Sequence, residues 1–573
     1  MHNSKNKRGV LDKLIARLQK IINHLPGPGK LIFGALVADR KAFDVLVACI
    51  VAVFATYLQP PVLSLYTPII QQGLRTPGSG TPLFVAAGYL LLAVLTLVGG
   101  ASGDIFGRKR FLQVGLFGVL MTNLFGMIFL NSPNYILINT LNTIATVVVM
   151  PMTVAIVTIA FPVQVRPFAY GAIFGTQGAA LIIASSLNAI ALDAGVQWMA
   201  FIPAIAVAVL AIRLVRRDTQ ESRAPIGTSR QELFLNVVWA SAIFGLVYGL
   251  IAFGGGLTER NIWIIVAICI LGFVIGYRWI MRRLRGRVLK LYNVRDLSFA
   301  ILAGIMLSVG QASFFYQIGS YFQKIQQVGP VESGLRLVPF VLAMIIATFL
   351  IVRLSMRFDA RWLISGGISV MAIGTALLFF LQPDTPYWQL ILPIAIMGLG
   401  FGIATPARTV VVLTIPPPGI VGVSAGINTA AGQSGFTLGT IISSILVTVF
   451  ANRYFVEQLV QSHVPLNIIK EVDIVFQDVF ARVISGNLTH LPDSLVDKVT
   501  VSFSEAFSVG LGHTYLVIAL LLVATAAVIF VGMTKGLKGT LISQPIGTHT
   551  LEPAHPNAEP LPPSSESKGG NMA

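Results

Sequence analysis

Charged residues are scarce in this sequence. Asp, Glu, Lys and Arg make up 11% of its 573 residues, whereas an ordinary soluble domain carries roughly 25%. This composition excludes a soluble globular protein. Cysteine is nearly absent too, and Cys49 and Cys269 both lie inside apolar runs, where they predict neither a disulfide framework nor a metal site. The chain also lacks a Walker glycine loop and an H-E-x-x-H motif, so we expect no ATP-driven pump, no enzyme and no cofactor.

Long apolar runs make up much of the sequence. Hydrophobic residues make up 55% of the chain. They gather in runs of about 20 residues, the length that crosses a hydrocarbon core roughly 30 Å thick as a helix. The sequence therefore predicts an all-α membrane protein with 14 transmembrane helices. We place these spans near 43–64, 83–100, 111–131, 134–161, 168–191, 198–215, 234–254, 261–281, 297–319, 335–354, 362–381, 387–414, 424–450 and 513–533.

The basic residues are distributed unevenly between the connections. The net charge is +17, and most of the 40 lysine and arginine residues fall before span 1, in alternate connections, and after span 14. The positive-inside rule then places both termini in the cytoplasm of a multi-pass protein in the plasma (inner) membrane. The positive charge records this orientation, and we expect no nucleic-acid partner.

Several segments lie outside the predicted bundles. Residues 1–42 form a basic amphipathic helix on the cytoplasmic leaflet with its linker, or a helix packed beneath the bundle. Residues 216–296 hold an inserted helix pair with basic cytoplasmic loops, and residues 451–512 form an external segment. The Pro- and Ser-rich residues 534–573 are expected to be a disordered cytoplasmic tail. The bundles themselves occupy residues 43–215 and 297–533.

The turn between spans 2 and 3 carries a distinctive motif, GGASGDIFGRKRFL at residues 99–112. Gly100 and Gly107 permit close backbone approach, and Asp104 is placed to cap a helix start and to pair with cations. Arg108 and Lys109 hold the turn at the lipid headgroups. The motif closely resembles the G-x-x-x-D-x-x-G-R-K signature of the major facilitator superfamily, with Ile105 at a position that is usually basic. The resemblance implies a cytoplasmic gating motif.

Further stretches resemble the 14-span drug:proton antiporter group of that superfamily: WMAFIPAIA at 198–206, YFQKIQQVGPVESGLRLVP at 321–339 and PPPGIVGVSAGINTAAGQSGFTLGT at 416–440. With spans 7 and 8 as an insertion, spans 9–14 repeat spans 1–6. The turn RLSMRFDARWL at 353–363 is then a degenerate copy of the motif that keeps Arg357 and Arg361. The resemblance implies two six-helix bundles, spans 1–6 and 9–14, around a midplane cavity.

The sequence departs from this group where functional charges are usual. Gln59 occupies the position of the span 1 carboxylate, and Asn139 that of the span 4 arginine, with Asn142 beside it. Span 5 lacks the proline of the antiporter kink. We find no charged residue in the middle of any span, since Arg408 lies near the inner end of span 12. The sequence therefore predicts that a central coupling carboxylate has been lost.

Neutral amides remain as candidates for the substrate cavity. They are Gln59, Asn139, Asn142, Gln177, Gln311, Gln317 and Gln433. Alternatively, such amides hold neighbouring helices together, as polar side chains in membranes commonly do.

The sequence thus favours a secondary transporter that moves a small organic or lipid-like amphiphilic solute by alternating access, with export expected and a monomer as the working unit. Two alternatives stay open. One is a proton-coupled multidrug antiporter, and the other is a non-transporting membrane sensor or scaffold that uses the external segment.

Overall fold

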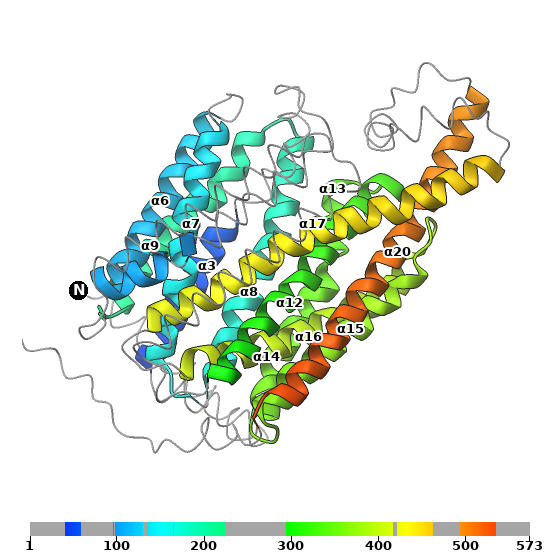
Figure 1. Ribbon diagram of the computed structural model, residues 1–573. Helices are drawn as coiled ribbons and strands as arrows, with labels where there is room; N and C mark the ends of the chain where they lie inside the picture. The colour runs from blue at the N-terminus through cyan, green and yellow to red at the C-terminus, as the bar shows by residue number, and fades with distance from the viewer. Residues whose placement is uncertain are drawn as a thin grey trace, which may run out of the picture.

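The computed structural model describes residues 40–58, 95–96, 98–129, 135–163, 165–223, 294–415, 421–461 and 493–534. Within these ranges all regular secondary structure is helical, and the helices gather side by side in one elongated bundle (Figure 1). The expected amphipathic helix, the inserted helix pair and the C-terminal tail lie outside the described residues. The boundaries proposed for those segments stay predictions.

Two groups of helices follow one another along the chain. The N-terminal half contains α3 (Arg40–Tyr57), α6 (Arg108–Ile128), α7 (Tyr135–Ala160), α8 (Arg166–Asp193) and α9 (Phe201–Asp218). The C-terminal half contains α12 (Val294–Ser320), α14 (Val338–Ser355), α15 (Ala360–Leu377), α16 (Tyr387–Thr414), α17 (Val421–Gln461) and α20 (Asp493–Gly532). Short elements η2 (Gln197–Ala200), η3 (Tyr321–Ile325), α13 (Pro330–Leu335) and η4 (Leu378–Phe380) join or extend them.

Ten helices in the described residues are long and apolar enough to cross a membrane. Their positions agree with predicted spans 3–6 and 9–14, and α3 occupies most of predicted span 1. Most of span 2 and all of spans 7 and 8 lie outside the described residues. The all-helical membrane class is therefore confirmed, and the count of fourteen stays a prediction.

The last two helices extend further than the apolar pattern indicated. Helix α17 continues to Gln461 and α20 begins at Asp493, so parts of the expected external segment 451–512 continue the spans as helix (Figure 1). Helical periodicity without a breaking residue explains the extension, because a helix can leave the apolar layer without ending. His513, expected at the start of span 14, lies inside α20, about 28 Å from its Gly532 end at 1.5 Å per residue.

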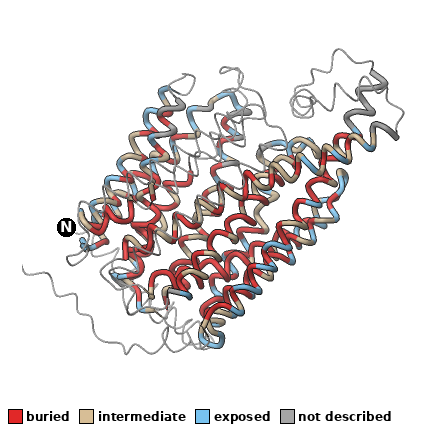
Figure 2. The backbone as a smooth tube through the Cα atoms, in the orientation of Figure 1, coloured by how far each residue is buried: buried red, intermediate tan, exposed pale blue. Residues whose placement is uncertain are grey.

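The outer faces of the bundle are apolar. Large side chains such as Ile128, Trp388 and Val531 are 70% or more exposed, while the buried residues run through the interior of both halves (Figure 2). A soluble protein rarely exposes so much contiguous apolar surface, whereas lipid solvates it at no cost. The bundle therefore presents the surface that a bilayer requires.

The two halves meet through pairs of helices. A Cβ on Gly171 of α8 would lie 2.6 Å from Cγ2 of Thr348 on α14, and α7 packs against α17. Small residues at such crossings let helices approach closely in a membrane.

Candidate functional site

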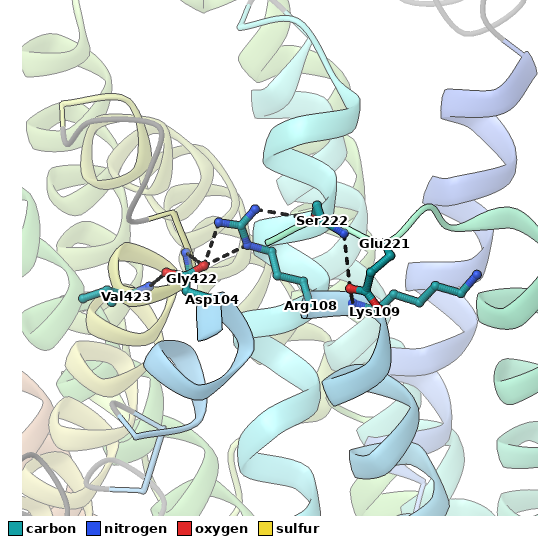
Figure 3. A network of polar contacts seen from close by, with 7 residues as sticks. All are labelled: Asp104, Arg108, Lys109, Glu221, Ser222, Gly422 and Val423. Atoms are coloured by element: carbon teal, nitrogen blue, oxygen red, sulfur yellow. Dashed lines mark hydrogen bonds and ion pairs between the residues drawn. The ribbon is translucent and has the colours of Figure 1, made fainter. Parts of the chain in front are cut away.

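The carboxylate of Asp104 joins the two halves of the bundle (Figure 3). Its Oδ1 accepts a hydrogen bond from the backbone N–H of Gly422 at 3.0 Å, and its Oδ2 accepts one from that of Val423 at 2.9 Å. Arg108, one turn further on, donates from Nε to Oδ1 at 2.9 Å and brings Nη2 within 2.6 Å of the same oxygen. Asp104 is 1% exposed. We call the end of the bundle that holds this contact the motif end.

Helix polarity explains why a carboxylate lies there. Helix α17 begins at Val421, so the N–H groups of its first turn have no acceptor within the helix and carry the positive end of the helix dipole. Asp104 supplies the missing acceptor and the opposite charge from the other half of the protein. Such a contact holds the two halves together at the motif end for as long as it is made.

Gly100 makes the contact sterically possible. A Cβ at this position would lie 2.5 Å from the carbonyl oxygen of Gly422 and 2.9 Å from Cα of Gly426. Both neighbours are backbone atoms of α17, which cannot swing aside as a side chain can. The backbone of the segment from Gly100 to Asp104 is therefore in direct contact with the backbone at the start of α17.

The basic part of the motif ties α6 to the end of α9. Lys109 Nζ donates to the carbonyl oxygens of Arg216 and Thr219, at 2.9 and 2.7 Å, where α9 ends. In return the Glu221 carboxylate accepts the backbone N–H groups of Lys109 and Arg110, at 3.1 and 3.2 Å, where α6 begins. The positive charge of Lys109 thus faces the negative C-terminal end of α9, and the negative charge of Glu221 faces the positive N-terminal end of α6.

The turn that leads into α6 depends on one glycine and on one carboxylate from beyond the end of α9. Gly107 has a φ of +107°, a conformation that glycine adopts without strain. Sequence reasoning missed Glu221, because the helix start that it caps lies 112 residues away along the chain and no local pattern indicates such a contact. Three of the five motif residues, Asp104, Arg108 and Lys109, come together with Glu221 and Ser222 in one network (Figure 3).

The equivalent turn of the C-terminal half lacks this carboxylate. Gly107 precedes α6 as Asp359 precedes α15, and three residues earlier the chain has Asp104 in the first turn but Met356 in the second. Met356 is 38% exposed. Arg361 lies over the ring of Phe530 on α20, at 4.6 Å from its centroid, and so packs within its own half.

Two of the predicted cavity amides bond neighbouring helices instead. Asn142 is 3% exposed, and its Oδ1 accepts the hydroxyl of Thr122 on α6 at 2.8 Å. Gln317 is 4% exposed and donates to Ser443 and Ser444 of α17 at 3.2 and 3.3 Å. These contacts support the alternative role of holding helices together.

Three other amides have hydrogen-bonding capacity to spare. Gln177 on α8, Gln311 on α12 and Gln433 on α17 are half-buried, and their side chains make no hydrogen bond with another described residue. Gln59 and the side chain of Asn139 lie outside what the structure describes. Of the five candidates whose side chains the structure describes, these three are available to a solute.

Arg408, expected near the inner end of span 12, is buried between helices. Its α16 position is six residues from Thr414, the last residue of the helix, yet the side chain is 4% exposed and Nη1 donates to Oδ1 of Asn428 on α17 at 2.7 Å. Helical side chains lean toward the N-terminus of their helix, which carries the guanidinium away from the motif end. The sequence position alone concealed this depth.

Buried charge in the described residues is otherwise confined to helix ends. Besides Arg408, the buried charged residues there are Asp104, Arg108 and Asp296. Asp296 lies in the first turn of α12 and accepts the backbone N–H of Thr534, which follows α20, at 2.9 Å. Both buried carboxylates thus stand at helix termini, where backbone groups and cations stabilise their charge.

A multi-helical membrane protein in two halves, joined at one end by a carboxylate on a helix terminus, has the construction of a solute transporter that works by moving its halves. The chain belongs to the Major Facilitator Superfamily, whose pattern it matches over residues 45–327 and 299–456. It is accordingly a secondary transporter that carries small molecules across a membrane, and no enzyme.

Individual relatives and solved structures agree with this assignment. The puromycin resistance protein pur8 of Streptomyces alboniger is 26% identical over 427 residues, 72% of this chain and 82% of the relative. The multidrug efflux pump LfrA of Mycolicibacterium smegmatis is 22% identical over 514 residues, 86% of this chain and 97% of the relative. A crystal structure of a double-tryptophan mutant of XylE has the same fold, with a TM-score of 0.55 and 15% identity, and the match covers 88% of this chain and 99% of that one.

Proposed function

We propose that this protein exports a small organic or amphiphilic solute across the plasma (inner) membrane by alternating access, as a monomer with both termini in the cytoplasm. The basic residues favour this orientation. Relatives named as a resistance protein and an efflux pump favour export over uptake. The observation that carries the proposal is the contact of Asp104 with the first turn of α17.

In this proposal the motif end is the cytoplasmic end and Asp104 closes it. Gly100, Asp104, Gly107, Arg108 and Lys109 form the gating motif. Arg108 and Lys109 fix the turn to its own half, while Asp104 and Gly100 make the contact with α17 that must break when the protein opens to the cytoplasm. The structure as described then represents the state closed at the cytoplasmic side.

The solute meets neutral polar groups between the halves. Gln177 comes from the N-terminal half, and Gln311 and Gln433 come from the C-terminal half. Because each is half-buried without a described partner, a solute can hydrogen-bond to all three without breaking an existing contact. Gln59 and Asn139 complete the proposed set from spans 1 and 4.

Cells that express the protein should export amphiphiles that carry no permanent positive charge. We would load a host lacking its own efflux pumps with a panel of neutral, cationic and anionic amphiphiles and measure retention over time. Members without a permanent positive charge should be lost faster than from cells that carry the empty vector. Export restricted to permanent cations would contradict a pathway built from neutral amides.

The panel also tests the non-transporting sensor or scaffold. A scaffold leaves retention of every compound unchanged. Deleting residues 462–492, between α17 and α20, should leave export intact if the protein is a transporter, because the deletion spares both helices.

Proton coupling through a central carboxylate is not expected, because the buried carboxylates of the described residues stand at helix ends. Asp104 is the favoured alternative coupling group. Burial raises the pKa of its carboxyl above the ordinary value, while the charge of Arg108 and the N–H groups of Val423 and Gly422 oppose that rise. Protonation of Asp104 would weaken its contact with α17 and so open the motif end.

A pH-sensitive dye enclosed in proteoliposomes separates these possibilities. We expect the exported solute to cause no proton movement. Proton movement that accompanies solute export by the native protein would favour the proton-coupled antiporter. A flux that Gln59→Ala abolishes and Asp104→Asn leaves intact would contradict both accounts, because it would place coupling in span 1.

A further inference from the structure

Arg408 is a buried cation that forms no ion pair with a residue that the structure describes. Its side chain is 4% exposed, and none of the ion pairs in the described residues includes it. Its hydrogen bond to Asn428 satisfies Nη1, while Nε is buried without a partner. An uncompensated charge in a protein interior is costly, and natural proteins retain one where it has a use.

One edge of the guanidinium has unused hydrogen-bonding capacity. With Nη1 directed to Asn428, the edge formed by Nε and Nη2 makes no hydrogen bond with a described residue. Two parallel N–H groups along such an edge match the two oxygens of a carboxylate, which is the strongest bidentate contact that arginine makes. The free edge therefore has the shape of a carboxylate receptor.

Glycines provide the space that the guanidinium occupies. A Cβ on Gly304 of α12 would lie 2.7 Å from Cζ of Arg408. On α17, a Cβ on Gly432 would lie 3.9 Å from Nη2 and 3.6 Å from Oγ of Ser308. The head group thus lies between α12, α16 and α17, with the open Nη2 on the side of Gly432 and Ser308.

A second polar group with unused capacity lies on the same side of α16. Thr405, one turn before Arg408, is 2% exposed, and its hydroxyl is buried without a hydrogen-bond partner. Residues three apart share a face of a helix. Two polar groups with unsatisfied atoms therefore occupy neighbouring positions, as expected of a site that awaits a ligand.

The depth of this group suits a transport site. Gly304 lies ten residues from the start of α12 and Gly432 lies eleven residues from the start of α17, about 15 Å from the motif end at 1.5 Å per residue. The guanidinium therefore lies inside the bundle and not at its motif end. Gln311 and Gln433 follow on the same two helices, on the far side of Arg408 from the motif end.

We propose that Arg408, with Asn428 and Thr405, binds the carboxylate of an organic anion in the transport pathway, while Gln311 and Gln433 contact the rest of that solute. The proposal rests on the transport function above and narrows its substrate class to carboxylate-bearing amphiphiles. The ligand neutralises the buried charge, so the loaded protein is more stable than the empty one.

The test compares two probes of the same shape, 1-naphthoate and 1-naphthamide, which differ in charge. The purified full-length protein is heated with each probe at millimolar concentration and its unfolding temperature is measured. Naphthoate should raise this temperature and naphthamide should not. Arg408→Gln should weaken naphthoate binding on the order of 30-fold or more, since a buried charge pair loses one partner. Equal effects of the two probes on the native protein would overturn the proposal.

Matched variants separate binding from folding. Arg353→Gln removes the same charge from an exposed position on α14 and should keep the response to naphthoate. Without ligand, Arg408→Gln should unfold at the same or a higher temperature than the native protein, because glutamine can still donate to Asn428 and no charge stays buried. A lower unfolding temperature together with an unchanged naphthoate response would show that Arg408 serves only to hold helices together.

Two further variants leave the charge in place. Gly304→Ala puts a methyl group where the guanidinium now lies and should abolish the naphthoate response. Arg408→Lys, which keeps the charge but loses the planar edge, should bind naphthoate more weakly than the native protein and more tightly than Arg408→Gln. Equal binding by the lysine and glutamine variants would contradict a role for the charge.

Transport assays keep this proposal distinct from the function on which it rests. If vesicles move naphthamide and naphthoate alike and Arg408→Gln changes neither, the anion site is wrong and the transport function stands. If naphthoate stabilises the protein through Arg408 but neither probe crosses the membrane, the site stands and the transport function is wrong for these solutes.

Discussion

Asp104→Asn should open the motif end and reduce export at least about tenfold. The asparagine keeps the shape of the side chain but removes the charge that faces the first turn of α17. A hydrogen bond to a charged group contributes about 1.5–3 kcal/mol, so loss of charge from two such bonds weakens the closed state by about 3 kcal/mol. Since 1.4 kcal/mol is a factor of ten, the closed population relative to the open one falls about 100-fold.

Distances between spin labels measure this shift directly. Labels at the exposed positions Val114 on α6 and Met356 beyond α14 report on separation of the halves, with Cys49 and Cys269 replaced by serine. The distance should lengthen in Asp104→Asn. Asp384→Asn, which neutralises an exposed carboxylate outside the motif, should leave it unchanged. An Asp104 variant with the native distance and native export would refute the gating role.

Gly100→Ala should impair closure as strongly, and by a steric route. The added methyl carbon would lie 2.5 Å from the carbonyl oxygen of Gly422 and 2.9 Å from Cα of Gly426, well inside the usual separation of carbon atoms of about 3.5–4.0 Å. Because these are backbone atoms, they cannot rotate away as a side chain can. The segment that contains Gly100 and helix α17 must therefore move apart. Export should fall, and the label distance should lengthen as in Asp104→Asn.

The adjacent glycine supplies the control. A methyl group on Gly99 would meet Val147 of α7 at 3.5 Å, an ordinary contact within the same half. Gly99→Ala should therefore retain export and the native label distance, although it makes the same chemical change one residue earlier. If both alanine variants behave alike, loss of helix flexibility rather than contact with α17 would explain the effect.

The predicted spans were reliable where apolar length alone decides the outcome. The bounds of α16, Tyr387–Thr414, agree with the predicted span, because polar and proline residues flank it on both sides. The start of α20 was predicted twenty residues late, since a helix that leaves the membrane changes composition without changing backbone. Hydropathy detects the change in composition but not the continuation of the helical backbone.

Within the candidate site, local sequence was informative for short contacts and silent on long ones. The spacing of Asp104 and Arg108 indicates their pairing. Nothing in the motif indicates that the N–H groups of Gly422 and Val423 lie opposite. Arg408 was misjudged for a related reason: its distance from the helix end was counted along the backbone, while its long side chain carries the charge to Asn428.

The exposed Met356 at the turn between α14 and α15 has a consequence for how the protein moves. Its counterpart in the other half, Asp104, accepts a hydrogen bond from α17 across the interface, whereas Met356 has no charge with which to make such a contact. Of the two equivalent turns, only the one with Asp104 therefore contributes a charged contact to the closed state. We expect a bound solute to offset about 3 kcal/mol at this contact when the motif end opens.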